Sequence, residues 1–394
     1  MAASYSKLLI MKLAAKISLG LFSIASVISL LALSKKPDYK KPVQPKIQAA
    51  ILLDVSGSMD GLIEQAKAQL WNMVNTMGKA KCTGDVAPQI EIALYEYGRT
   101  TNDANAGYVK KINDFISDLD SLSQNLFSLK TNGGDEYCGQ VIYSSLKELQ
   151  WDAAPENYKV IFIAGNEDFL QGNIQYTQSC KEAKQKGVIV NTIYCGDKMQ
   201  GIAEHWNLAG ECGNGSYTNI NQNTKEEEIS TPYDSMIYVM NNKLNGTYIT
   251  YGYAGVTYQA KQGSMDVANT TMSKEAGMKR IKAKSSGKVY QNAHWDLVDA
   301  NANGDFNFKT LDKKNLPDSL KNKNEEELKK FIAIKSKERS AIQNEIITLN
   351  TQRDAYIATE KAKNAAAINN SPTLETEVEK IIKEQARRFN MRIE

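Results

Sequence analysis

Short apolar runs alternate with helical patterns of apolar residues from residue 46 to about residue 221. Each run has the length and the composition of a buried strand. The runs are residues 48–54, 89–97, 158–165, 187–195 and 216–220. Between them, apolar residues recur at helical spacing, as in Leu62, Ala66 and Leu70. This alternation predicts a mostly parallel sheet that is covered by helices on both faces.

The first strand ends abruptly at Asp54, and a turn with Ser56, Gly57 and Ser58 leads directly into a helical pattern. One carboxylate and two hydroxyls are hard oxygen ligands of the kind that Mg2+ prefers. In such sheets ligands bind at the carboxyl ends of the strands, where Asp54 lies. Ser and Asp also cap helix N-termini, so these residues alone leave two alternatives, a metal site and an ordinary turn.

Two later loops follow in the order that one fold requires. They are Leu129-Lys-Thr131-Asn-Gly-Gly-Asp135-Glu136 and the strand end Val160-Ile-Phe-Ile-Ala-Gly-Asn166-Glu167. With Asp54-x-Ser56-x-Ser58 they resemble the three metal-site loops of a von Willebrand factor type A (VWA) domain, and residues 190–220 are similar to that family's last strands. The resemblance covers residues 46–221. It implies a Rossmann-like α/β fold, with a mostly parallel central sheet flanked by helices.

The resemblance also implies a metal-ion-dependent adhesion site. In that family the first-loop Asp and its two Ser, with a Thr or an acid from the second loop, hold Mg2+ and leave one position for a partner's acidic side chain. Carried over, the first-loop ligands are Asp54, Ser56 and Ser58. In the second loop Asp135 occupies the place where many members have Thr, and Thr131 lies just upstream. Mn2+ is an alternative ion for such a site.

The third loop departs from the family's pattern. Gly165 stands where members commonly have Asp, and Asn166, Glu167 and Asp168 follow it. Glu167 is the candidate ligand here, with indirect ligation or a ligand from a neighbour as alternatives. Helix N-termini favour the same residue types, so an ordinary turn is also open.

Charge and histidine content narrow the function. With 48 basic against 45 acidic residues, the formal net charge of +3 gives no electrostatic footprint for nucleic acid. The chain has 2 histidines, His205 and His294, and neither lies near a second His or a Cys at metal-ligand spacing. Few catalytic constellations can be built from them, so we expect no enzyme, and hydrolytic activity ranks last.

Residues 1–36 predict a membrane segment, because an uncharged run from 17 to 34 is flanked by lysines on both sides. Its length leaves a cleaved signal peptide and an uncleaved anchor as alternatives. Residues 37–45 then read as an extended, proline-rich spacer. The chain is therefore expected in the cell envelope, as a periplasmic, membrane-anchored or secreted protein.

The 5 cysteines contain no Cys-x-x-Cys pair, which argues against zinc and redox motifs. In an exported chain they predict two disulfides and one remaining thiol, with the connectivity left open.

Residues 222–310 are expected to form a small mixed α/β region, in which the tyrosine-rich stretch 247–259 would be a strand pair. Residues 299–310 resemble the first half of a calcium loop. Its twelfth position is Thr310, where such loops need a bidentate Glu, so a plain turn is favoured over Ca2+ binding.

Residues 324–394 carry two narrow apolar stripes that are separated by the break Asn369-Asn-Ser-Pro372. The stripes predict a helical hairpin or a coiled-coil tail. Packing on the chain itself, binding of a partner and oligomerisation through the tail all remain open.

The favoured function is metal-dependent protein binding or adhesion in the cell envelope, with Mg2+ receiving an acidic side chain of a partner protein. The alternative is a metal-free VWA scaffold whose C-terminal helices bind the partner.

Overall fold

The computed structural model describes residues 44–221, 228–287, 289–304, 306–363 and 374–393. The predicted membrane segment, residues 1–36, lies outside the described residues, as do residues 37–43 of the spacer. No helix in the described part is both long enough and apolar enough to cross a membrane.

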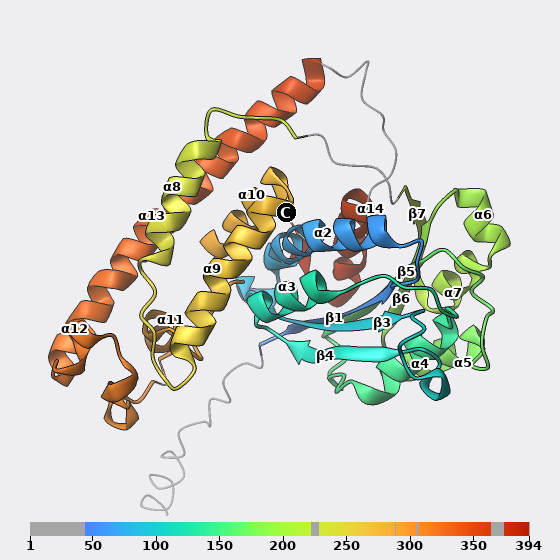
Figure 1. Cartoon of the computed structure of the whole chain (residues 1–394), viewed down its shortest axis with the longest axis horizontal. Helices are drawn as coiled ribbons and strands as arrows, with labels where there is room; N and C mark the ends of the chain where they lie inside the picture. Colours follow the sequence, from blue (N-terminus) through green and yellow to red (C-terminus); the bar gives the residue numbers. More distant parts are fainter. Residues whose placement is uncertain (1–43, 222–227, 288, 305, 364–373, 394) are drawn as a thin grey trace, which may run out of the picture. The chain divides into compact units, whose positions relative to one another are not determined.

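A six-stranded sheet forms the centre of the first domain (Figure 1). In spatial order its strands are β4 (Lys110–Ile116), β3 (Gln89–Tyr97), β1 (Lys46–Asp54), β5 (Tyr158–Gly165), β6 (Ile189–Cys195) and β7 (Asn214–Ile220). Neighbouring strands are parallel, except that β4 runs antiparallel to β3. The predicted Rossmann-like sheet is confirmed. β4 was not predicted from the sequence, because its residues are exposed or half-buried and do not form an apolar run.

Helices cover both faces of the sheet, as the sequence predicts. One face packs against α2 (Asp60–Gly78), α3 (Leu119–Ser128) and α14 (Leu374–Ala386). The other packs against α4 (Cys138–Glu148), α5 (Tyr176–Lys186) and α7 (Trp206–Cys212). The central strand β1 supplies both cores, since Ile51 and Leu53 belong to the first and Ala50 and Leu52 to the second. This division follows from the alternation of side chains along a strand.

Between residues 228 and 363 the described segments form helices joined by loops, with no strand among them. The helices are α8 (Asp234–Asn245), α9 (Gly255–Met272), α10 (Lys274–Ser285), α11 (Leu297–Ala302), α12 (Asp318–Lys321) and α13 (Glu325–Lys363). The strand pair expected for residues 247–259 is replaced by an isolated bridge from Thr250 to Asp296 and by the start of α9. The buried face of α9 includes Gln262 and Asn269, which lie two helical turns apart. Because these residues are polar, the helix has no regular apolar stripe that could have predicted it from the sequence.

Residues 299–310 do not form a calcium loop in their described part. Asp299 lies in α11, where its carboxylate accepts a hydrogen bond from Arg339 Nη1 at 2.7 Å. Thr310 ends a short 3-10 helix and donates to the carbonyl oxygen of Asn307. Asp299 is thus held by an ion pair within the chain.

The two helices of residues 324–394 have different partners, in place of the expected hairpin. α13 packs on α8, α10 and α11, whereas α14 packs on α2 and β7. Beyond α14, the short strand β8 (Arg392–Ile393) pairs antiparallel with β2 (Ala80–Lys81). Buried Val378 and Ile382 of α14 belong to the same core as α2. The last described residues therefore complete the sheet domain, and both apolar stripes have buried side chains packed on the chain itself.

One disulfide joins Cys180 in α5 to Cys212 in α7, where two disulfides were expected from the sequence. Cys82, Cys138 and Cys195 are buried and free. Cys138 lies in the core on one face of the sheet, and the other two thiols lie in the core on the opposite face. The sheet itself therefore prevents Cys138 from pairing with either of them.

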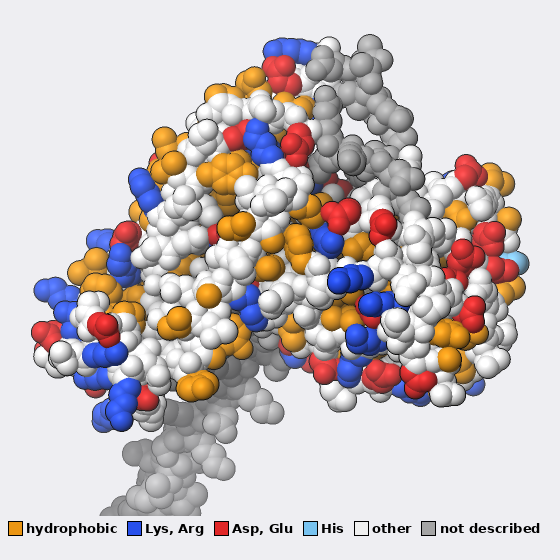
Figure 2. Space-filling model, viewed as in Figure 1, with side chains coloured by type: hydrophobic (Ala, Val, Ile, Leu, Met, Phe, Trp, Pro, Cys, Tyr) orange, Lys and Arg blue, Asp and Glu red, His pale blue; other side chains and the backbone are white. Residues whose placement is uncertain are grey.

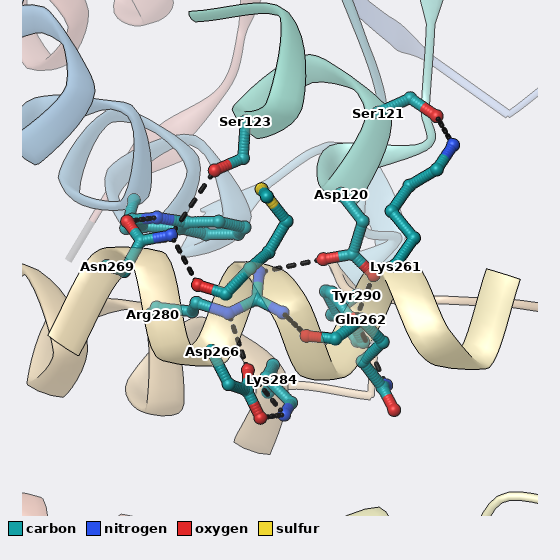
Figure 3. Close-up of polar contacts among 12 residues, drawn as sticks. Asp120, Ser121, Ser123, Lys261, Gln262, Asp266, Asn269, Arg280, Lys284 and Tyr290 are labelled. Atoms are coloured by element: carbon teal, nitrogen blue, oxygen red, sulfur yellow. Dashed lines mark hydrogen bonds and ion pairs between the residues drawn. The ribbon is translucent and has the colours of Figure 1, made fainter. Parts of the chain in front are cut away.

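A buried polar network fixes the helical region to the sheet domain (Figure 3). Arg280 of α10 is 1% exposed and donates to Asp120 of α3 at 2.7 Å and to Asp266 of α9 at 2.6 Å. Lys284 donates to Asp266 at 2.7 Å, and Tyr290 donates to Asp120 at 2.5 Å. Burial opposes ionisation of Asp266, but Lys284 and Arg280 hold the pKa of this carboxyl well below its ordinary value.

We expect Arg280→Met to lower the free energy of unfolding by about 3–5 kcal/mol, because it leaves two buried carboxylates without their shared cation. The control is Lys282→Ala on the same helix, whose exposed ion pair with Asp354 should contribute less than about 1 kcal/mol. Urea unfolding measures both. An Arg280→Met loss no larger than that of Lys282→Ala would contradict this role.

Candidate metal centre

Asp54 and Ser56 place two buried oxygen atoms at the carboxyl end of β1. Asp54 is 0% exposed, and its Oδ1 accepts a hydrogen bond from the Ser56 backbone N–H at 2.7 Å. Asp54 Oδ2 and Ser56 Oγ are buried and have no hydrogen-bond partner among the described residues. Buried polar atoms are nearly always satisfied in folded proteins, so two neighbouring exceptions call for a ligand.

The first loop does not cap the helix that follows it. α2 is preceded by Met59, and no side chain at this position donates or accepts a capping hydrogen bond. The hydrogen bond from the Ser56 N–H to Asp54 therefore lies within the turn itself and does not cap α2. Ser58 is exposed beside the buried pair, and Asn166 Nδ2 lies 3.4 Å from its Oγ.

The second loop brings Glu136 to Asp54. A Cβ atom added at Gly98 would lie 2.8 Å from Glu136 Cγ and 3.0 Å from Asp54 Oδ1, so both carboxylates flank this glycine. Glu136 is 7% exposed. Its neighbour Asp135 is exposed and accepts a hydrogen bond from the Tyr137 hydroxyl at 3.2 Å.

Thr131, the other second-loop residue carried over from the family, donates its hydroxyl hydrogen to Asp60 in the first turn of α2. Of the two acidic residues in this loop, Glu136 is buried beside Asp54 and Asp135 is exposed. Sequence reasoning passed over Glu136 because its burial depends on Gly98, which is distant along the chain and lacks a side chain.

The third loop explains why Gly165 replaces the family's Asp. A Cβ atom at Gly165 would lie 2.5 Å from the Tyr97 hydroxyl and 2.9 Å from Asp54 Oδ2, so no larger residue fits. The backbone N–H of the next residue, Asn166, acts to lower the pKa of Asp54. Its side-chain Oδ1 is a further buried oxygen without a partner among the described residues. The third loop thus brings the amide side chain of Asn166 next to Ser58 of the first loop.

Glu167 is half-buried and contributes negative charge to the same site. Burial raises the pKa of Asp54 to about 6, opposed by the Ser56 hydrogen bond and assisted by the charge of Glu167. Burial and the charges of Asp54 and Glu167 raise the pKa of Glu136 to about 8. In Figure 2 several more acidic side chains lie over α6 (Lys198–Ala203), which follows β6 at this edge of the sheet.

The donor set fits a hard divalent cation. It consists of carboxylate, hydroxyl and amide oxygens, which Mg2+ and Mn2+ prefer, and it contains no thiolate or imidazole. Within the described ranges, no three His, Cys, Asp or Glu side chains converge on one point. Binding here would therefore rely on the Ser and Asn oxygens as well as the acids.

Comparisons with known proteins add a resemblance of fold. No family model matches the chain, and no curated protein matches it. Similar solved structures include proximal thread matrix protein 1 from the mussel byssus with a zinc-occupied MIDAS motif, at 13% identity and a TM-score of 0.34 over 45% of this chain and 41% of that chain. A von Willebrand factor type A structure from Catenulispora acidiphila is 13% identical, with a TM-score of 0.34 over 45% of this chain and 39% of that chain.

An aerotolerance-related membrane protein from Bacteroides fragilis is 16% identical, with a TM-score of 0.33 over 45% of this chain and 93% of that one. The chain thus spans less than half of the mussel and Catenulispora chains. The strand order and the parallel pairing of β1 with β3 and β5 give residues 46–221 the Rossmann-like α/β fold that the sequence implies.

In EDTA at pH 8, we expect Asp54→Asn to raise the free energy of unfolding by about 1–3 kcal/mol, because a buried carboxylate is then ionised in the wild type. The folded-state pKa of about 6 lies above the unfolded value of 3.8, so the difference should shrink as the pH falls from 6 towards 4. The exposed Asp85→Asn is the control, because it makes the same change of carboxylate to amide outside the buried site. Urea unfolding across this range measures it, and a less stable Asp54→Asn at pH 8 would contradict it.

Gly165→Ala should destabilise the protein by about 1–3 kcal/mol, because the added methyl group overlaps Tyr97 and Asp54. Gly263→Ala in α9 is the matched control, since nothing lies within 4 Å of its added methyl group. That control should stabilise the helix by about 0.5–1 kcal/mol. Thermal unfolding of both variants measures the difference, and equal effects would show that Gly165 is not sterically required.

Proposed function

We propose that this chain is a binding protein that captures an acidic side chain of a partner protein through a divalent metal ion. The observation that carries the proposal is the pair of buried oxygens without partners, Asp54 Oδ2 and Ser56 Oγ. A Mg2+ or Mn2+ ion would be held by Asp54, Ser56 and Ser58, with Glu136 and Asn166 beside them. When bound, the ion supplies a coordination position that a carboxylate can fill.

The charges of the site support a cation as its missing component. Asp54, Glu136 and Glu167 repel one another, and repulsion in a buried site is costly. In the described part of the chain, none of the three forms an ion pair with Lys, Arg or His within 4.0 Å. A bound divalent ion would offset the repulsion among the three carboxylates. The partner's carboxylate would then approach a positively charged ion.

We propose binding without catalysis, and a place in the cell envelope. His205 is engaged with Asp168 at 3.0 Å, and the ring of His294 packs against Tyr258 at 4.6 Å. The apolar N-terminal run and the Cys180–Cys212 disulfide favour an exported chain. The metal-free alternative, in which the tail binds the partner, is less favoured because α13 and α14 bury apolar residues within the chain.

Titration of the full-length chain with Mg2+ and Mn2+ tests the metal. We expect binding at millimolar concentrations, with about 1.4 kcal/mol of stabilisation at ten times Kd. Asp54→Ala should abolish it. Calorimetry and thermal unfolding measure both, and the absence of heat and of stabilisation would overturn the proposal.

Substitutions of Glu136 and Asp135 test which of these two adjacent acids is the second-loop ligand. Glu136→Gln should weaken Mg2+ binding about tenfold or more, because it removes a buried carboxylate beside Asp54. Asp135→Asn, one residue away and exposed, should change the affinity less than about threefold. The reverse ranking would assign the second-loop ligand to Asp135.

A further inference from the structure

A cavity of about 560 Å³ opens at the edge of the sheet opposite the metal centre. Asp54 is the last residue of β1, whereas the cavity lies at the amino ends of β5, β6 and β7. Its lining includes Lys159, Lys184 and Arg388, together with the apolar Val188 and Phe389. No acidic side chain is among the described residues that line it.

Lys159 places a buried ammonium group at this cavity. Its side chain belongs to a residue that is 4% exposed, and Nζ donates to the backbone oxygen of Asp152 at 2.8 Å. The carboxylate of Asp152 forms an ion pair with Lys46 at 3.5 Å. Within the described ranges, Lys159 has no carboxylate of its own within 4.0 Å. Burial accordingly lowers the pKa of Lys159.

Gly187 opens the space above this ammonium group. A Cβ atom there would lie 3.6 Å from Lys159 Nζ and 3.8 Å from its Cε, with no other atom as close. The backbone of Gly187 has φ +64° at the C-terminal end of α5, a conformation that favours glycine. The side chain that would cover Lys159 is therefore absent.

The C-terminal segment completes the cavity. Arg388 Nη1 donates to the backbone oxygen of Asn214 at 2.7 Å, which fixes the guanidinium group at the start of β7. The ring of Phe389 lies 5.2 Å from the ring of Tyr158. A guanidinium group has five N–H donors, so several remain for a ligand. In the part of the chain that the structure describes, neither Arg388 nor Lys184 forms an ion pair with a carboxylate.

We propose that this cavity binds a small organic anion, whose phosphate or carboxylate group contacts Lys159, Lys184 and Arg388 and whose apolar part lies against Val188 and Phe389. Three cations that have no counter-ion within the described ranges supply the charge, and the buried one, Lys159, would be stabilised by a paired anion. The volume lies in the range of small-molecule sites. This site is independent of the metal centre, which lies at the other edge of the sheet.

Calorimetric titration of the full-length chain tests the proposal with three small molecules that share a phenyl ring. Phenyl phosphate and benzoate carry the two candidate anions on a ring, and phenol is their neutral control. We expect one or both anions to bind in EDTA at concentrations up to about 10 mM, with no binding of phenol. The stronger of the two anions identifies the preferred group. No binding of either anion, or equal binding of phenol, would overturn the proposal.

Matched variants locate the site. Arg388→Ala and Lys184→Ala should each weaken anion binding about tenfold, because each removes a charged hydrogen-bond donor. Arg387→Ala and Lys181→Ala remove exposed cations that do not line the cavity, and they should leave the affinity within about twofold. Equal losses in both pairs would mean unspecific charge attraction.

Two further measurements keep the outcomes distinct. All four residues are exposed, so unchanged thermal unfolding without ligand verifies that the variants fold. Asp54→Ala should bind the anions as the wild type does, so failure of metal binding and failure of anion binding are separate results. Loss of anion binding in Asp54→Ala would overturn the assignment to this cavity.

Discussion

The burial of Arg280 between two carboxylates is the constraint on which the arrangement of this chain depends. Asp120 comes from a helix of the sheet domain and Asp266 from the helical region, and both share one guanidinium group. This group also lies 4.7 Å from the centre of the Trp71 ring. A buried ion pair gives little net stability but leaves costly unpaired charges when it is broken. α9 and α10 therefore have one favourable position on α3.

The metal centre has the opposite electrostatic design. At Arg280 the chain supplies both signs of charge, whereas Asp54, Glu136 and Glu167 bring the same sign together. The first arrangement is complete within the protein, and the second needs an external cation. The cavity at Lys159 repeats the second arrangement with the sign reversed. Unbalanced charge at the two edges of the sheet is the shared basis of both proposals.

The sequence predicts those parts of the structure in which the residues of a single segment are enough to show whether that segment is buried. β1 and β5 each contain a continuous apolar run, Ala49–Leu53 and Val160–Ala164, so burial of these runs on both faces could be inferred, and the position of Asp54 follows from the end of β1. The burial of Glu136 beside Asp54 could not be inferred, because it depends on Gly98 in another loop.

The segments against which the C-terminal helices pack could not be predicted from the sequence either. A narrow apolar stripe shows that a helix packs on something, but it does not say on what. The stripe of α14 meets α2, which lies about three hundred residues earlier in the chain, and its pattern is the same as that of a hairpin helix. The strand pair that the tyrosines of residues 247–259 predicted was wrong for a different reason. They suit a strand, but Tyr248 lies 5.5 Å from Trp295 in a stacked pair beside the helices.

The position of α14 and β8 has a consequence for the order of events during synthesis. Residues 374–393 cover a face of the sheet whose first strand begins at residue 46, so that face stays open while the intervening residues are made. Folding of the sheet domain is therefore a late and non-local event, with an apolar surface exposed in the meantime. Such a nascent chain exposes apolar surface for longer than a domain made from one contiguous segment, which makes it more prone to aggregate before synthesis is complete.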